Sequence, residues 1–270
     1  MIGFRHPFLM HAILAVTQSH DFTLQHEGSP TEWSTHWHHA ISLLNSVLSS
    51  PLNSEARDAV WLSSSLVSVV YFARITRQGD HQSDWPLTPP ALDFTWLRLC
   101  EAKRLAAALT NPLREDSQVR DMASEVMVHI AEMERVVAIQ PPGPSALPDA
   151  LTQFLQFHFY QNDLYHTAVL GLSEIYRLSV RQESFLQHLS FLSILVADFR
   201  RLLELRDAKA LLILLYWHVR TCELRIWWMW KHAWTEGTAI CKFLSGVWES
   251  LPELLTLLTY PRAMLLTNKP

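Results

Sequence analysis

Glycine is scarce in this chain, with only 7 among 270 residues, well below the usual share of about 7%. Doubly wound α/β folds and tight β-hairpins use glycine at their turns, so both architectures are disfavoured. Segments with apolar residues three and four positions apart dominate instead, which is the spacing of amphipathic helices. We therefore predict an all-α protein of roughly nine to eleven helices.

Cysteine and charged residues are also few. Cys100, Cys222 and Cys241 are far apart and odd in number, which excludes a disulfide framework and the closely paired cysteines of a structural zinc site. Reduced, buried thiols in an intracellular protein are the expected state. The 22 basic and 26 acidic side chains give a net charge of −4. Because nucleic-acid surfaces are usually basic, we expect no direct contact with nucleic acid.

Catalytic signature motifs are missing as well. The sequence has no HExxH, GxSxG, P-loop, GxGxxG or aspartate-rich motif, so metal- and cofactor-dependent enzyme classes lose support. We expect no metal and no cofactor. His36, His38 and His39 lie close together, but no third convergent ligand or carboxylate–histidine pattern accompanies them. We interpret them as a hydrated edge beside an inward-packing Trp37.

The longest apolar run, in "ALLILLYWHVRTCELRIWWMW" at residues 210–230, is too short to cross a membrane. A spanning helix needs about 18 or more apolar residues, whereas this run is bounded by Lys209 and by His218 and Arg220. It is typical of a helix buried on most sides. The N-terminal "MIGFRHPFLMHAILAV" lacks a clear cleavage site, so we interpret it as a first core helix and not as a signal peptide.

Apolar periodicity and helix-capping residues give the approximate helix boundaries. The expected helices are 7–19, 31–48, 54–76, 93–110, 114–139, 149–159, 163–178, 183–205, 207–225, 226–244 and 249–258. Two proline-rich segments, 76–90 and 140–150, read as loops. Residues 140–149 form either a sub-boundary or a long surface loop, and we favour one domain over residues 1–270, built around a hydrophobic cavity.

The tryptophans suggest the wall of a binding cavity. The chain has 11 tryptophans, of which Trp217, Trp227, Trp228, Trp230 and Trp234 are clustered. Such side chains offer large rigid surfaces with a polar edge, which suits a polycyclic, mostly apolar guest. Aromatic stripes at helical spacing also occur in ordinary cores. The residues that we expect to line the cavity are Tyr71, Trp96, Met133, Leu214, Trp217, His218, Cys222 and Trp228.

Three titratable residues are candidates for proton transfer. His129 lies between apolar neighbours and one turn before Glu132, and a histidine beside a carboxylate can act near neutral pH. His218 and Glu223 follow the apolar run. A core histidine bonded to a backbone carbonyl is the alternative interpretation of each imidazole.

Three segments together resemble a known family. "HPFLMHAILAV" at 6–16, "LDFTWLRLCEAKR" at 92–104 and "DAKALLILLYWHVRTCELRIWWMWKHAWTEGTAICKFL" at 207–244 occur in order. They resemble the C-terminal regulatory domain of fungal zinc-cluster transcription factors of the sterol-uptake-control type. The resemblance implies an all-helical domain whose cavity, toward its C-terminal part, holds a sterol. The family's DNA-binding zinc cluster has six cysteines and lies upstream of this domain, so this chain is not expected to read DNA in that way.

Three functions follow as alternatives. The first is a module that binds a sterol- or terpenoid-like small molecule. The second is a cofactor-independent enzyme of fungal secondary metabolism, a cyclase, isomerase or pericyclase that folds a polyene or terpenoid in the same cavity. The third is an interaction protein, such as a dimeric partner of a full-length regulator, so a homodimer is also considered.

Overall fold

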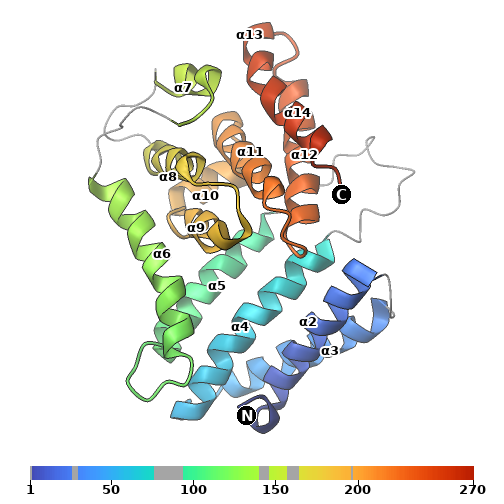
Figure 1. Cartoon of the computed structure of the whole chain (residues 1–270), viewed down its shortest axis with the longest axis vertical. Coiled ribbons are helices and arrows are strands. Elements are labelled where there is room, and N and C mark those ends of the chain that lie inside the picture. The colour runs from blue at the N-terminus through green and yellow to red at the C-terminus, as the bar shows by residue number, and fades with distance from the viewer. Residues whose placement is uncertain (1, 26–29, 76–93, 140–145, 157–163, 196) are drawn as a thin grey trace. The chain divides into compact units, whose positions relative to one another are not determined.

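The computed structural model describes residues 2–25, 30–75, 94–139, 146–156, 164–195 and 197–270 (Figure 1). Of the residues that the structure describes, 81% are helical and none lies in a strand. The all-α prediction is confirmed, and the number of longer helices is close to that expected. Of the predicted loops, residues 76–90 and most of 140–150 lie outside the described residues.

The chain divides into two compact units. Unit 1 comprises Met1–Asp80 and Thr95–Val126, and unit 2 comprises His81–Phe94 and Met127–Pro270. The boundary falls within the helix α6 (Arg120–Ile139). One domain over 1–270 remains a prediction, and each unit is described on its own below.

Unit 1 is built from long helices around a tryptophan-rich core. The core side chains Trp33 and Trp37 of one helix pack with Ala12, Ala15 and Val67 of its two neighbours. The Trp37 indole donates to the Val67 carbonyl at 3.3 Å, which satisfies its polar atom inside the core. The complete helices of this unit are α1 (Ile2–Arg5), α2 (Pro7–Gln25), α3 (Pro30–Leu48), α4 (Ser54–Ile75) and α5 (Thr95–Thr110).

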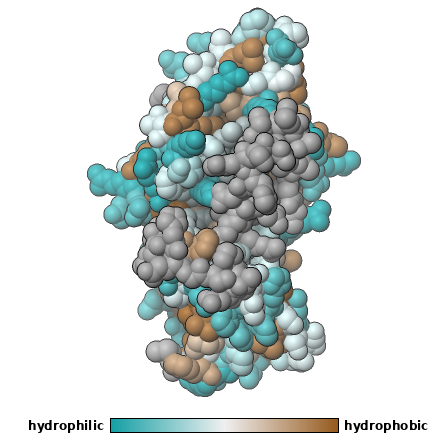
Figure 2. Space-filling view, turned by 90° about the vertical axis from the view of Figure 1, so that its right-hand side faces the viewer, coloured by the Kyte–Doolittle hydropathy of each residue, from teal (hydrophilic) through white to brown (hydrophobic). Residues whose placement is uncertain are grey.

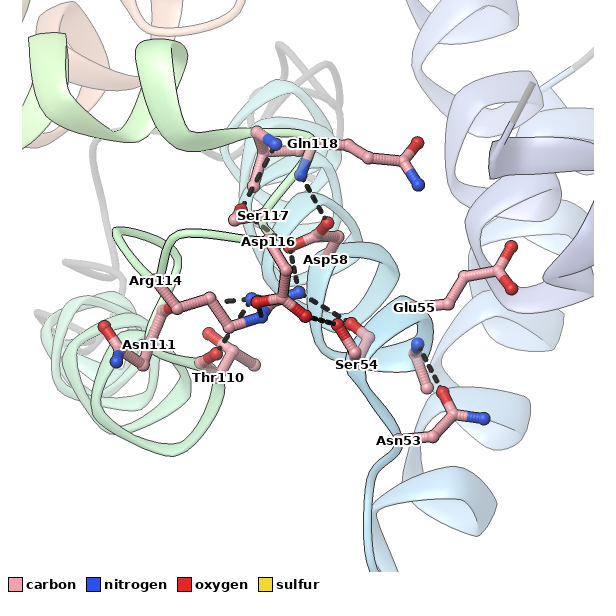
Figure 3. Close-up of polar contacts among 12 residues, drawn as sticks. Asn53, Ser54, Glu55, Asp58, Thr110, Asn111, Arg114, Asp116, Ser117 and Gln118 are labelled. Carbon is pink, nitrogen blue, oxygen red and sulfur yellow. Dashed lines mark hydrogen bonds and ion pairs between the residues drawn. The ribbon is translucent and has the colours of Figure 1, made fainter.

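A buried ion pair fastens the segment between α5 and α6 to the start of α4 (Figure 3). The Asp58 carboxylate of α4 is 1% exposed and contacts the Arg114 guanidinium at 2.7 Å. It also accepts hydrogen bonds from Ser117 Oγ and Gln118 N, both at 2.8 Å. Arg114 donates to the Ser54 carbonyl at 2.6 Å. Both charges are therefore paired and hydrogen-bonded, as burial requires.

Unit 2 is arranged around the helix α11 (Ala208–Glu223), which packs against α8, α10, α12 and α14 (Figure 1). Residues 210–219 of α11 are all buried. Asp207 caps its first turn by accepting from the amides of Lys209 and Ala210. The other elements are α7 (Asp149–Gln156), α8 (His166–Arg177), η1 (Gln182–Ser184), α9 (Phe185–Ser190), η2 (Phe191–Ser193), α10 (Ala197–Glu204), α12 (Trp230–Val247), α13 (Pro252–Leu255), η3 (Thr256–Leu258) and α14 (Thr259–Thr267).

The structure corrects the helix predicted over residues 183–205. That segment consists of η1, α9, η2 and α10. The Ser190 and Ser193 hydroxyls donate to the carbonyls of Gln187 and Ser190, and such local bonds compete with a regular helix. The predicted helix 249–258 is also wrong in extent, because the helical segment continues through α14 to Thr267.

Left-handed residues end three helices. Asn111, Arg206 and Arg225 have φ angles of 44°, 57° and 50°, a conformation that glycine normally supplies at helix ends. Arg225 ends α11, which explains why α12 begins at Trp230 and not at residue 226 as predicted. In this glycine-poor chain, an asparagine and two arginines thus occupy left-handed positions that glycine usually takes.

The surface is mixed in hydropathy. Figure 2 shows one face, on which hydrophobic residues are interspersed with hydrophilic ones, as is normal for folded proteins. Within the described residues, none of the helices has the length and apolar character that crossing a membrane would require.

Candidate functional site

Trp217 lies at the centre of the candidate site. It is 0% exposed, and its ring stacks on Phe191 with the centroids 5.9 Å apart. Its indole Nε1 donates to the backbone carbonyl of His188 at 3.1 Å. Trp217 therefore holds α9 and η2 against α11 through both a stacked ring and a hydrogen bond.

His188 is a buried acceptor beside Trp217. Its side chain is 1% exposed, and its Nδ1 lies 2.8 Å from the Ser184 carbonyl, which can only accept a hydrogen bond. Burial lowers the pKa of His188, so the ring is neutral and its one proton sits on Nδ1. Nε2 then presents a bare lone pair, and no donor from the described part of the chain reaches it.

Arg220 follows Trp217 by three residues on α11 and thus lies on the same face, one turn on. Its guanidinium pairs with Glu223 at 2.8 Å and donates to the Leu178 carbonyl at 2.7 Å. It also lies over the Tyr176 ring, 5.2 Å from the centroid. These contacts occupy the two terminal nitrogens, while the buried Nε has no acceptor among the residues that the structure describes.

Three tyrosines complete the polar cluster next to Arg220. Tyr176 donates to the carbonyl of Tyr216 at 3.1 Å, and Tyr216 donates to the carbonyl of Leu257 at 2.8 Å. Tyr260 of α14 stacks on Tyr216 at 5.9 Å. Burial raises the pKa of all three phenols. Their hydroxyls stay protonated at neutral pH and serve as hydrogen-bond donors.

A pair of imidazoles lies between α11 and α12. His218 and His232 are both 0% exposed, and their rings meet edge to face with centroids 5.9 Å apart. Burial lowers the pKa of His232 to about 3 and that of His218 well below its usual value. Both rings are neutral at physiological pH. Among the predicted proton-transfer residues, this favours Glu223 over His218 as a charged participant.

The other predicted site residues are divided between the two units. Leu214, Trp217, His218 and Cys222 are all buried on α11, and burial also raises the pKa of the Cys222 thiol. In the same unit Trp228 meets the Phe185 ring edge to face at 5.4 Å, while Met133 is buried and His129 half-buried on α6.

Tyr71 and Trp96 lie in unit 1. Tyr71 packs on the core cluster around Trp37, and the Trp96 ring meets Phe72 edge to face at 6.0 Å. The structure thus brings the predicted residues of α11 together on one buried helix. Tyr71 and Trp96 instead pack against other residues of unit 1.

Sequence reasoning found Glu223, which pairs with Arg220, but missed the rest of the polar part of the site. His188, Arg220, Tyr176 and Tyr260 were not among the predicted residues. Arg220 did carry a signal, since it is a single cation one turn after Trp217 in a nearly uncharged helix. His188, a lone histidine in "FLQHLSF", carried a weaker one. Nothing local distinguishes Tyr260.

A histidine cluster also forms in unit 1. His11 Nδ1 lies 2.8 Å from His36 Nδ1, and the His11 ring stacks on His39 at 5.1 Å. Burial, then His36 and His39, lower the pKa of His11. Over the described ranges, no group of three or more histidines, cysteines or acidic residues is arranged to hold a metal ion.

Comparisons of the chain with protein families, with curated proteins and with solved structures found no match.

Proposed function

We propose that unit 2 binds a hydrophobic, polycyclic small molecule of sterol- or terpenoid-like kind alongside α11. The supporting observation is the junction on this helix, where ten consecutive buried residues, 210–219, end at the polar cluster around Arg220. Small-molecule sites combine an extensive apolar surface with a few convergent polar groups. The resemblance of residues 207–244 to regulators of sterol uptake supports the same function.

Tryptophan fluorescence tests this proposal. Titration with ergosterol or farnesol should quench emission saturably, because Trp217 lies on α11, alongside which the ligand is proposed to bind. Trp217→Phe should reduce the quenching, whereas Trp61→Phe, in the core of unit 1, should leave it unchanged. Emission that stays constant with every sterol and terpenoid tried would reject the proposal.

A second candidate is a cofactor-independent cyclase, isomerase or pericyclase. Tyr260 favours it, because this half-buried phenol stacks on Tyr216 and its pKa is raised by burial and by Glu223. A neutral hydroxyl fixed in this way can stabilise charge developing on a substrate oxygen. Co-expression with neighbouring biosynthetic genes should then change their product, and Tyr260→Phe should abolish the change. A product profile that is identical with and without this chain would exclude the enzyme.

The intracellular location and the homodimer remain predictions from the sequence. The relationship to zinc-cluster regulators is also a prediction from the sequence. The fluorescence titration with sterols is its first test.

A further inference from the structure

We infer that the bound molecule is an alcohol, whose hydroxyl group donates to His188 Nε2 and accepts from Arg220 Nε–H. This inference rests on the proposed function and specifies the polar end of the ligand. It follows from two buried nitrogens of opposite hydrogen-bonding character in the same part of unit 2.

The hydrogen bond at His188 Nδ1 determines that Nε2 of the same ring is a hydrogen-bond acceptor. Ser184 O takes the Nδ1 proton of His188, and Ser184 is itself held by its hydroxyl, which donates to the carbonyls of Ser179 and Arg181 at 2.8 Å. The ring is thus held in one tautomer. A buried polar atom without a partner is costly and is rare in folded proteins. We therefore expect a hydrogen-bond donor of the ligand at His188 Nε2.

The other contacts of the Arg220 guanidinium leave its Nε–H as the available hydrogen-bond donor. Arg220 is held at one end by Glu223 and at the other by Leu178 O, which fixes the guanidinium with its Nε–H buried. Trp217 and Arg220 are one turn apart on α11, and Trp217 bonds the backbone of His188. The positive charge of Arg220 also acts on the His188 ring. The two nitrogens accordingly belong to one neighbourhood.

Only some functional groups satisfy both nitrogens. A hydroxyl has one proton to donate and lone pairs to accept with. A ketone or ether accepts from Arg220 but leaves His188 Nε2 unsatisfied. A carboxylate places negative charge against that lone pair, and an ammonium group would repel the guanidinium. An alcohol is the one of these classes that complements the pair.

Isothermal titration with matched probes tests the inference. Cholesterol and 4-cholesten-3-one differ at the oxygen-bearing end, as do farnesol and farnesal. The wild-type chain should bind each alcohol about tenfold more tightly than its carbonyl partner, which corresponds to one buried hydrogen bond. His188→Asn keeps a donor for Ser184 O but has no group at the Nε2 position, so it should lose the preference. His188→Gln places an amide oxygen there and should retain most of it. Arg220→Lys keeps the charge without Nε and should weaken alcohol binding.

The outcomes separate the two claims. Binding of no probe at all would reject the proposed function. Equal binding of alcohol and carbonyl probes, unchanged in His188→Asn, would overturn the inference while leaving the proposed function in place. The ¹⁵N chemical shift of Nε2 in the wild-type chain gives a readout without any variant. This chemical shift should change when cholesterol is added and stay constant with 4-cholesten-3-one. A chemical shift that does not change on addition of cholesterol would also overturn the inference.

Discussion

Single residues in unit 2 show how closely its helices approach. A methyl group built on Gly171 of α8 would lie 2.2 Å from Ile194 Cδ1 and 3.2 Å from Phe191 Cδ2. Both neighbours are buried, so the added methyl must displace packed side chains. Gly171 is thus required by the approach of α8 to η2, and not by a turn.

Gly171→Ala should therefore destabilise the protein by about 1–3 kcal/mol, the usual cost of overpacking. Gly246→Ala is the matched control, because a methyl group there meets nothing within 4 Å and alanine favours a helix by up to about 1 kcal/mol. Urea denaturation measures both. Equal stability of the two variants would show that Ile194 moves aside freely.

The tryptophans also act as individual hydrogen-bond donors. Trp230 and Trp234 of α12 donate to the carbonyls of Asn268 and Leu265 at 2.8 and 2.9 Å. The rings therefore provide apolar surface, and their N–H groups also link α12 to the C-terminal residues. This second role was not anticipated from the aromatic stripes in the sequence.

At the scale of elements, these bonds attach α14 and the following Asn268 to α12. Of its own residues, α14 buries only Pro261 and Leu265 among those described, so the indole bonds and the Tyr260–Tyr216 ring contact add to a small apolar interface. Trp234→Phe should cost about 1 kcal/mol, the typical net value of one hydrogen bond. Amide hydrogen exchange should quicken in residues 259–268 while α11 stays protected. Unchanged exchange in α14 would mean that apolar packing alone holds it.

The segment between α5 and α6 depends on a buried charge. Asp58→Asn leaves the buried Arg114 guanidinium without its carboxylate partner at that position, and breaking a buried pair typically costs about 3–5 kcal/mol. Asp116→Asn is the control, because the Asp116 side chain is 62% exposed and exposed pairs contribute about 0–1 kcal/mol. Thermal unfolding of both variants makes the comparison. Similar losses in the two would argue against a special role for Asp58.

At the scale of the whole molecule, the buried histidines should make stability depend on pH. The pKa values of His218 and His232 are lowered in the folded state from an ordinary value of 6.5, that of His232 to about 3. Between these values the unfolded chain binds protons that the folded chain does not. The free energy of unfolding should thus be fully retained above pH 6.5. Below it, the free energy should fall by up to about 1.4 kcal/mol per pH unit for each histidine.

Urea denaturation at pH 7.5 and 5.0 checks this dependence. His232→Leu should show a smaller difference between the two pH values, because one of the histidines that bind a proton on unfolding is gone. An identical difference in the variant and the wild-type chain would show that other groups set the acid sensitivity.

The sequence was informative where the determinants are local. The spacing of apolar residues indicated the all-α class, and the helices predicted to begin at residues 54 and 207 start at Ser54 and Ala208. It failed where structure depends on distant partners. The residues after Ser190 pack closely against Gly171 of α8, and the polar cluster joins Arg220 to Leu178. Such contacts join residues that are far apart in the sequence, so the spacing of apolar residues does not predict them.

Native mass spectrometry of the purified chain, followed by organic extraction, tests the central claim most directly. The account predicts a population heavier than the chain by the mass of one hydrophobic alcohol, either carried from the host or acquired from added ergosterol or farnesol. A spectrum that contains only the bare chain, both as purified and after incubation with these molecules, would contradict it.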